Sequence, residues 1–228
     1  MEFADINTMT LLDYPNKVAC VLYTQGCNFR CPFCHNGLTL VKGVDEYVPF
    51  EEIISFLKKR QGILDGVVIS GGEPTLMRDL KEKIRAIKEL GYLVKLDTNG
   101  TNPEVMLDLI NEGLIDYVAM DFKNSINKYE MTAGATIKEE KILKSVEILK
   151  SGVIDYEFRT TLIKEFHTGL DIISMGKTLK GAKRLYLQQF KVSDGVINKN
   201  LHPVDEDSAK EFVDILKEYI DEVELRGY

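Results

Sequence analysis

Cys27, Cys31 and Cys34 stand close together in one short segment, with the spacing Cys-x3-Cys-x2-Cys and an aromatic residue just before the last cysteine. Three thiolates at this spacing can hold three of the irons of a 4Fe–4S cube. The fourth iron then has no cysteine nearby and stays open for an outside ligand. A structural metal site closes its coordination, whereas a catalytic site keeps a vacancy. The spacing therefore predicts a cluster that takes part in chemistry.

Two other uses of these thiols fit less well. Three cysteines and His35 could form a Cys3His zinc site, but Cys34 and His35 are neighbours, and adjacent side chains rarely converge on one tetrahedral ion. A disulfide framework is typical of small secreted domains, and nothing in this chain indicates secretion. Cys20 lies in an apolar run from 18 to 23, so we expect it to be a buried core residue. One remaining cysteine cannot build a second all-cysteine cluster.

The composition is that of an ordinary globular protein. The chain has 228 residues, of which 44% are hydrophobic and 29% charged, which is enough to bury a sizeable core. Its net charge of -7 argues against broad nucleic-acid binding, which needs a basic surface. The acidic N-terminus has no apolar stretch behind it, so we expect neither a signal peptide nor a membrane helix. We therefore expect a cytoplasmic protein, since a reducing compartment also suits an oxygen-sensitive cluster.

Short apolar runs alternate with amphipathic stretches along the chain. The apolar runs predict six strands, at 18–24, 66–70, 93–96, 117–120, 156–163 and 184–189. The amphipathic stretches predict helices at 49–60, 80–90, 103–112, 137–150, 170–179 and 205–223. Strands that alternate with helices indicate parallel βα units, and six strands are too few to close an eight-stranded barrel.

We therefore expect an α/β fold with helices outside, either an open six-stranded barrel or a twisted open sheet. It would form one domain over residues 1–228, with a core at about 10–190 and the last helix after it. The segment 3–12 fits either an additional strand or a segment that lies across the barrel.

Polar residues follow every predicted strand or lie within it. Because the carboxyl ends of parallel strands meet at one edge of a β/α fold, we expect these residues on one rim. They are the cysteine loop, Ser70 to Pro74, Asp97 to Gly100, Asp121 to Lys123, Arg159 with Thr160, and Gln188 with Gln189. Charged or amide groups at every strand end are not needed for stability, so their coincidence predicts a functional site.

Taken singly, each of these residues also has a purely structural interpretation. The pair Gly71-Gly72 could form only a tight turn, although glycines also let a ligand approach the backbone without a Cβ clash. Glu73 can accept from a cationic amine, and Asp97 could be merely a turn acid. Lys123 and Arg159 are usually surface charges, but at strand ends that face a rim they are candidate partners for a carboxylate or a cation.

These motifs resemble the radical S-adenosylmethionine (SAM) superfamily. Its two most recognisable elements here are the cysteine loop and the segment Gly71-Gly72-Glu73-Pro74. Within the superfamily, the segments 34–36 (Cys-His-Asn), 96–100 (Leu-Asp-Thr-Asn-Gly) and 120–123 (Met-Asp-Phe-Lys) resemble glycyl-radical-enzyme activases. The stretch 10–15 (Thr-Leu-Leu-Asp-Tyr-Pro), which runs toward the cysteine loop, is most similar to activating proteins of anaerobic ribonucleoside-triphosphate reductase.

The resemblance implies a partial (β/α)6 barrel and a set of cofactor-binding residues. SAM would bind the open iron of the 4Fe–4S cluster through its amino and carboxylate groups. The turn Gly71-Gly72-Glu73 would hold the amino end of SAM, and Asp97 and Asp121 would hold a monovalent cation beside the SAM carboxylate. The others implied are Lys123 and Arg159, which would contact SAM or its carboxylate, and Phe33, near the adenine.

The resemblance further implies a reaction and its partners. An external one-electron donor such as flavodoxin or ferredoxin would reduce the cluster, the SAM carbon–sulfur bond would break, and the 5'-deoxyadenosyl radical would take a hydrogen from a glycine of a partner enzyme. The cofactors carry that chemistry, so no catalytic Ser, His or Asp constellation is expected in the chain. His167 and His202 fall in predicted loops, where we expect them at the surface.

Three alternatives stay open. Activases of pyruvate formate-lyase tend to carry a histidine just after the last strand, where this chain reads Gln188-Gln189-Phe190, and this difference favours the reductase branch. A small-molecule radical SAM enzyme such as 7-carboxy-7-deazaguanine synthase tends to follow its last cysteine with Asp-Thr, whereas this chain has His35-Asn36. An iron–sulfur electron carrier without SAM turnover would not need the Gly71-Gly72-Glu73 element or the charged rim.

Overall fold

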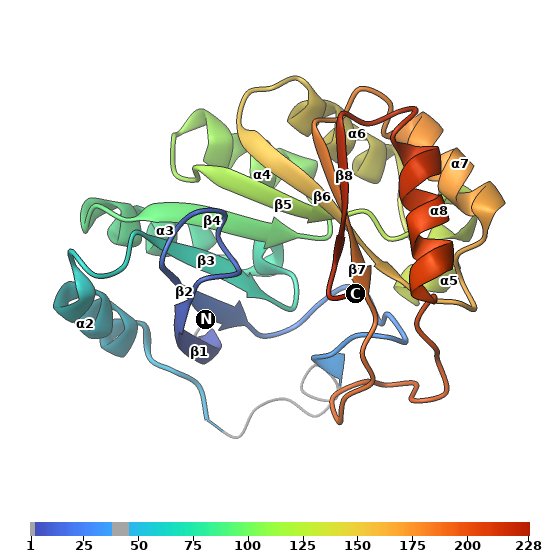
Figure 1. The fold of residues 1–228 in the computed structure, drawn as a ribbon. Helices are drawn as coiled ribbons and strands as arrows, with labels where there is room; N and C mark the ends of the chain where they lie inside the picture. The colour runs from blue at the N-terminus through green and yellow to red at the C-terminus, as the bar shows by residue number, and fades with distance from the viewer. Residues whose placement is uncertain (1–2, 38–45) are drawn as a thin grey trace.

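The frame of the protein is one eight-stranded sheet whose strands lie side by side in chain order. The computed structural model describes residues 3–37 and 46–228. The strands are β1 (Phe3–Thr10), β2 (Ala19–Thr24), β3 (Gly66–Gly71), β4 (Leu93–Thr98), β5 (Tyr117–Asp121), β6 (Asp155–Leu162), β7 (Arg184–Gln189) and β8 (Glu222–Arg226). β1 pairs antiparallel with β2, and every later pair is parallel. The sheet curves but stays open, because no pairing joins β8 to β1 within the described residues (Figure 1).

Helices connect the parallel strands and lie outside the curved sheet (Figure 1). They are α2 (Phe50–Arg60), α3 (Leu80–Glu89), α4 (Pro103–Asn111), the short α5 (Tyr129–Ala133), α6 (Glu139–Lys150), α7 (Gly169–Thr178) and α8 (Glu206–Leu216). Each longer helix presents one apolar side to the sheet; in α3 this side is formed by Leu80, Ile84 and Ile87, all buried. No helix among the described residues is long and apolar enough to span a membrane.

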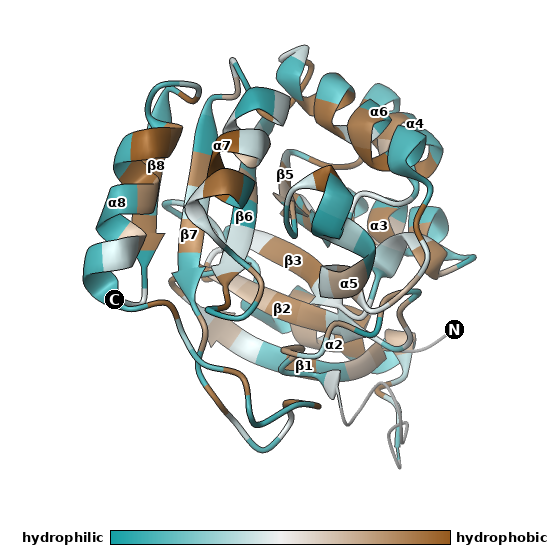
Figure 2. Cartoon of the chain, turned by 90° about the vertical axis from the view of Figure 1, so that its right-hand side faces the viewer, coloured by the Kyte–Doolittle hydropathy of each residue, from teal (hydrophilic) through white to brown (hydrophobic). Residues whose placement is uncertain are grey.

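Burial on both faces explains why the central strands read as continuous apolar runs. Figure 2 shows β2 and β3 as mainly apolar, whereas the helices alternate apolar and polar residues. The helices cover the outer face of this sheet, and a second cluster of side chains packs against its inner face. In this cluster Tyr14 packs with Val68 and Tyr117. The central strands are therefore packed on both faces.

The structure confirms the six predicted strands and the open α/β architecture, and it adds two strands at the edges. The segment 3–12 supplies the antiparallel strand β1. The predicted last helix is wrong at its end: α8 stops at Leu216, and Val223 lies in β8. The run 222–226 alternates polar and apolar residues, a period of two that is typical of a strand.

Candidate cofactor-binding site

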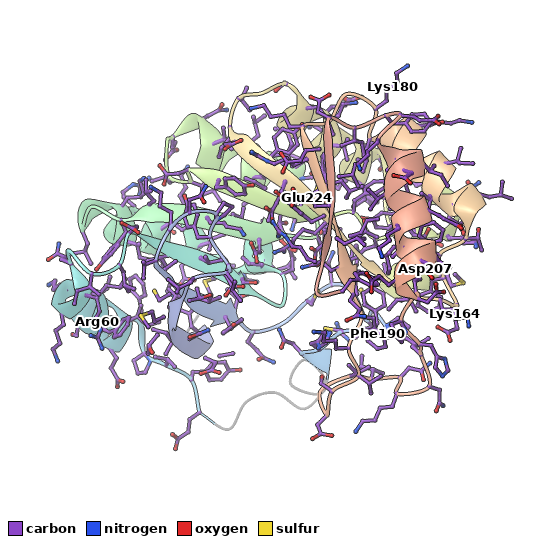
Figure 3. The ribbon with its side chains drawn as sticks, in the orientation of Figure 1. Arg60, Lys164, Lys180, Phe190, Asp207 and Glu224 are labelled. Carbon is purple, nitrogen blue, oxygen red and sulfur yellow. The ribbon has the colours of Figure 1, made fainter. Side chains whose placement is uncertain are left out.

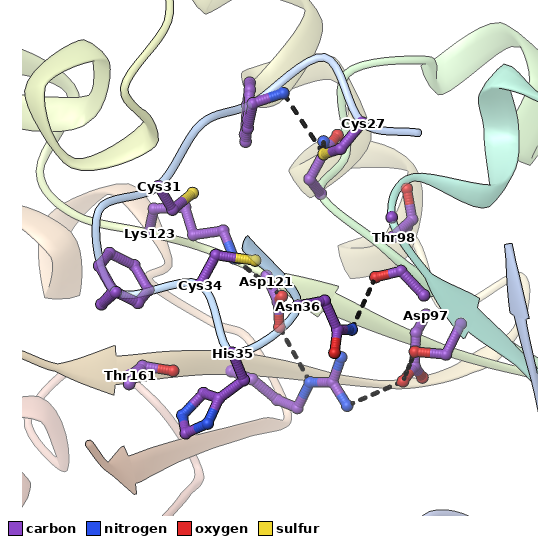
Figure 4. A pocket seen from close by; sticks show the side chains of 17 residues that line it. Cys27, Cys31, Cys34, His35, Asn36, Asp97, Thr98, Asp121, Lys123 and Thr161 are labelled. Atoms are coloured by element: carbon purple, nitrogen blue, oxygen red, sulfur yellow. Dashed lines mark hydrogen bonds and ion pairs between the residues drawn. The ribbon is translucent and has the colours of Figure 1, made fainter. Parts of the chain in front are cut away.

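One cavity at the carboxyl ends of the strands collects nearly all of the predicted site residues (Figure 4). β2 leads into the cysteine loop, and β3 to β6 supply the remaining walls. The predicted residues that line it are Cys27, Cys31, Cys34, Phe33, Gly71, Gly72, Asp97, Asp121, Lys123 and Arg159. Glu73 is the exception. Ser70, which was expected on the rim, also lines it, as does Thr161, which the sequence did not single out.

The cysteine loop turns tightly enough to bring its three thiols to this one cavity. The amide of Cys34 donates to Cys31 O at 3.0 Å, and the amide of Phe29 donates to Cys27 Sγ at 3.3 Å. Burial raises the pKa of all three thiols, that of Cys31 to about 11. Because a thiolate is the metal ligand, iron would have to displace these protons when it binds. Three thiols and a backbone donor to sulfur fit a 4Fe–4S cluster.

The position of His35 argues against the alternative of a Cys3His zinc site. It follows Cys34 directly, but Figure 4 shows its ring directed away from the three sulfurs. Its Nδ1 lies 3.4 Å from Ser193 Oγ, and its ring packs edge-on against Phe190, with 6.1 Å between centroids. The loop thus offers three thiols without the adjacent imidazole.

Two segments from elsewhere in the chain hold the cysteine loop in place. On one side Arg30 N donates to Ala133 O of α5 at 2.9 Å, and Phe29 packs on Tyr129. On the other side the segment after β7 covers the loop, where Asn198 N donates to Pro32 O at 2.9 Å. Figure 3 shows Phe190, at the start of this segment, beside the cysteine loop. Contacts within the protein therefore position the loop from both sides.

Gly134, which ends α5, allows one of these close contacts. Its φ is 63°, in the left-handed region, and a Cβ there would lie 2.2 Å from Arg30 O. We expect Gly134→Ala to push α5 from the loop and to reduce the iron bound after reconstitution by roughly half or more. Iron and sulfide analysis of the purified variant measures this loss.

Gly152 is the matched control for that substitution. Its φ is 77°, but nothing lies within 4 Å of the position of a Cβ. Gly152→Ala should therefore cost only the conformational strain, about 1 kcal/mol of the free energy of unfolding, and keep its iron. Equal iron loss in both variants would contradict the contact with Arg30 as the cause.

The carboxylate of Glu73 points into the protein and not into the cavity. Its side chain is 1% exposed. Oε1 accepts from Thr75 N, Thr75 Oγ1 and Thr98 Oγ1, and Oε2 accepts from Asn99 N at 2.7 Å. Because protein donors already occupy this carboxylate, we expect Glu73 to position the turn and not to contact a cationic amine directly. Glu73 ties the turn after β3 to the end of β4, and only Gly71 and Gly72 of this motif face the cavity.

Asn99 extends this tie to the cysteine loop. Its Nδ2 donates to Asn28 Oδ1 at 2.8 Å and lies 3.9 Å from Cys27 Sγ. The amide of Glu73 also donates to Gly26 O at 2.8 Å, just before the first cysteine. The ends of β3 and β4 and the start of the cysteine loop thus form one hydrogen-bonded unit.

Four charged side chains form a continuous chain of ion pairs along the opposite wall. Arg159 donates from Nε to Asp121 at 3.0 Å and from Nη1 to Asp97 at 3.2 Å, and Lys123 donates to Asp121 at 2.9 Å. Burial alone would raise the pKa of Asp121, but Lys123 and Arg159 outweigh it and lower the pKa to about 2. Burial opposes the charge of Lys123 and Arg159, yet Asp121 holds the pKa of Lys123 above the usual range, and Asp97 and Asp121 together do the same for Arg159. Asp121, Lys123 and Arg159 are therefore charged at neutral pH.

Lys95 and Glu157 extend this chain of ion pairs into the sheet. The sequence analysis singled out neither residue. Lys95 is 2% exposed, and its Nζ lies 3.6 Å from Asp97 Oδ1 and 3.9 Å from Glu157 Oε1. A lysine in the otherwise apolar start of β4 was the available signal, because buried charges are rare unless paired.

The expectation that His167 is a surface residue is wrong. It is 3% exposed, Ile163 N donates to its Nδ1 at 3.0 Å, and its Nε2 lies 3.0 Å from Lys123 O. Nε2 therefore carries the proton and donates it, which joins the ends of β5 and β6. His202 is exposed as expected and pairs with Glu165.

Comparison with known proteins shows the family. A family model described as the radical SAM superfamily matches residues 21–167. The chain belongs to the radical SAM superfamily. It is 39% identical, over 96% of its length and 92% of the relative, to a Methanocaldococcus jannaschii protein provisionally named a glycyl-radical enzyme activating enzyme. That likeness over nearly the full length places both chains in one family.

Solved structures show the same radical SAM fold. A radical SAM methyltransferase from Sphaerobacter thermophilus aligns with a TM-score of 0.75 at 15% identity, over 96% of this chain and 68% of that one. A domain of pyruvate-formate lyase-activating enzyme from Bacteroides vulgatus aligns with a TM-score of 0.58 at 18% identity, over 71% of this chain and 99% of that one. Membership implies a 4Fe–4S cluster and SAM, as expected from the cysteine loop.

Proposed function

We propose that the protein is an activase of the radical SAM superfamily that acts on a protein substrate, a glycyl radical enzyme. It reductively cleaves SAM and uses the 5'-deoxyadenosyl radical to abstract a hydrogen from a glycine of that enzyme. The partner we propose is anaerobic ribonucleoside-triphosphate reductase, and the activase works in the cytoplasm as a single radical SAM domain. The observation that carries the proposal is one cavity with three thiols on one wall and four paired charges on the other.

Each wall has a separate task in this proposal. Cys27, Cys31 and Cys34 hold the cluster, which when bound supplies the electron that breaks the carbon–sulfur bond. Backbone groups of Gly71 and Gly72 bind the amino end of SAM, because no Cβ blocks their approach. Lys123 and Arg159 face the SAM carboxylate. Three of their N–H donors already bind Asp97 and Asp121, so these two aspartates fix the direction of the N–H donors that remain for SAM.

Phe33 and Asp97 complete the cavity. The ring of Phe33 is buried, with Lys123 Nζ 5.8 Å from its centroid, and we place the adenine beside it. Asp97 Oδ1 is a buried carboxylate oxygen without a hydrogen-bond donor among the described residues. An acceptor of this kind fits a monovalent cation, which Asp97 and Asp121 would hold beside the SAM carboxylate.

The partner and the reaction are tested together by reconstitution under strictly anaerobic conditions. Reduced protein with SAM should form 5'-deoxyadenosine, and addition of an anaerobic ribonucleotide reductase should generate the glycyl radical signal in electron paramagnetic resonance. Pyruvate formate-lyase in place of the reductase should give no such signal. 5'-Deoxyadenosine without a radical on either protein would indicate a small-molecule substrate, and none at all would contradict SAM cleavage.

A further inference from the structure

A second hollow lies beside the cysteine loop, separate from the cofactor cavity. We call it the lysine pocket, and its walls include Asn28, Thr101, Thr136, Lys138 and Lys141. It lies where the cysteine loop meets the start of α4 and the segment before α6. The two hollows share no lining residue. The lysine pocket is therefore a distinct feature of the surface.

A single side chain separates the lysine pocket from the first cysteine. Asn28 donates from Nδ2 to Thr101 Oγ1, in the pocket wall, at 2.9 Å. Its Oδ1 lies 3.9 Å from Cys27 Sγ and accepts from Asn99 Nδ2 at 2.8 Å. Asn28 is exposed, whereas Asn99 is buried. Asn28 thus connects the wall of the lysine pocket to the surroundings of Cys27.

The charge of the lysine pocket differs in sign from that of the whole chain. The protein has a net charge of -7, yet the pocket has two lysines and no carboxylate among its lining residues. Lys141 pairs with Glu104 at 3.6 Å. Lys138 is exposed and has no ion pair within the described part of the chain. A cationic hollow on an acidic protein favours the approach of an acidic partner.

The reaction proposed above needs an electron, and the cofactor cavity is a poor entrance for it. During turnover that cavity holds SAM and the glycine that reacts, and water must be kept out of it. The donor therefore has to reach the cluster from another side, and Asn28 is the side chain that the lysine pocket places next to a cluster ligand.

We propose that the lysine pocket is the docking site for an acidic one-electron carrier protein, with Asn28 between the carrier and the cluster. In this step the carrier loses one electron and the cluster gains it, and no bond is formed or broken. This inference rests on the proposed function, because only reductive cleavage of SAM requires the donor.

The test compares two reductants on the charge-reversed protein Lys138→Glu/Lys141→Glu. One reductant is flavodoxin hydroquinone, an acidic carrier protein, and the other is dithionite, a small anion that needs no docking site. At low ionic strength we expect 5'-deoxyadenosine formation driven by flavodoxin to fall about tenfold or more, and formation driven by dithionite to change by less than about twofold. Added salt should narrow the gap between wild type and variant.

Lys177→Glu/Lys180→Glu is the matched control. Both lysines are exposed, and they lie at the opposite end of the sheet from the cysteine loop, as Figure 3 shows for Lys180. This variant has the same charge change and should behave like wild type with either reductant. An unchanged flavodoxin rate in Lys138→Glu/Lys141→Glu, an equal loss with both reductants, or no reduction of wild type by flavodoxin would overturn the docking site. No 5'-deoxyadenosine from wild type with dithionite would instead contradict the proposed function.

Discussion

Replacing any one of Cys27, Cys31 and Cys34 with alanine is expected to abolish SAM cleavage, with 5'-deoxyadenosine formation falling by about a hundredfold or more. Each of the three thiols binds a different iron, so two cysteines cannot retain a cube with a single open corner. Iron should fall from about four per chain to a small fraction of that in each variant. Iron counting, ultraviolet–visible absorption and product chromatography on the same samples measure these losses.

Cys20 supplies the control within the same chain. It is fully buried in β2, among apolar residues, and burial raises its pKa to about 12, so it stays a protonated core residue. Cys20→Ala should cost about 1–2 kcal/mol of the free energy of unfolding through lost packing, and keep its iron and its activity. A Cys20 variant without a cluster, or a Cys31 variant with a full one, would overturn the assignment of ligands.

The sequence was sufficient for the fold and for most of the site because both depend on local patterns. The apolar runs and their spacing identified the six parallel strands, and parallel strands place their carboxyl ends on one edge. Asp97, Asp121 and Arg159 are far apart in the chain, yet Asp97 and Asp121 each follow a predicted strand and Arg159 lies in one. Their meeting in one cavity could thus be expected before any contact was seen.

What the sequence did not reveal depends on where side chains point after packing. Glu73 looks like a ligand because acidic residues near glycines often face a cavity, but its partners Thr98 and Asn99 come from the neighbouring strand. His167 lies in a loop, yet the loop folds over the strand ends and buries it. β8 was missed because the helical pattern of the residues directly before it continues into the short alternation of polar and apolar residues at 222–226. Tertiary contacts decide each of these cases.

Glu73→Gln is the second substitution with a large expected effect. Whichever carboxylate oxygen becomes an amide nitrogen, it faces a backbone donor: Asn99 N at the position of Oε2, or Thr75 N at the position of Oε1. A buried amide pressed against a backbone N–H leaves both without an acceptor, so we expect a loss of about 3 kcal/mol in the free energy of unfolding. Urea denaturation of the apoprotein measures it.

The same substitution should weaken SAM binding more than it changes cluster loading. Glu73 fixes the turn that carries Gly71 and Gly72 directly, whereas it reaches Cys27 only through Asn99, and the cysteine loop keeps its contacts with α5 and the segment after β7. We expect the Kd for SAM to rise about tenfold, with most of the iron retained.

Asp116→Asn serves as the control for this pair of measurements. Asp116 accepts from Val94 N at 2.7 Å at the opposite end of β4, far from the cavity. Its loss should lower stability and leave SAM affinity unchanged. Glu73 does not line the cavity. If it nevertheless contacted SAM directly, the substitution would weaken SAM binding without lowering the stability of the apoprotein. Glu73→Gln with wild-type stability and weak SAM binding would therefore restore Glu73 as a ligand and contradict its positioning role.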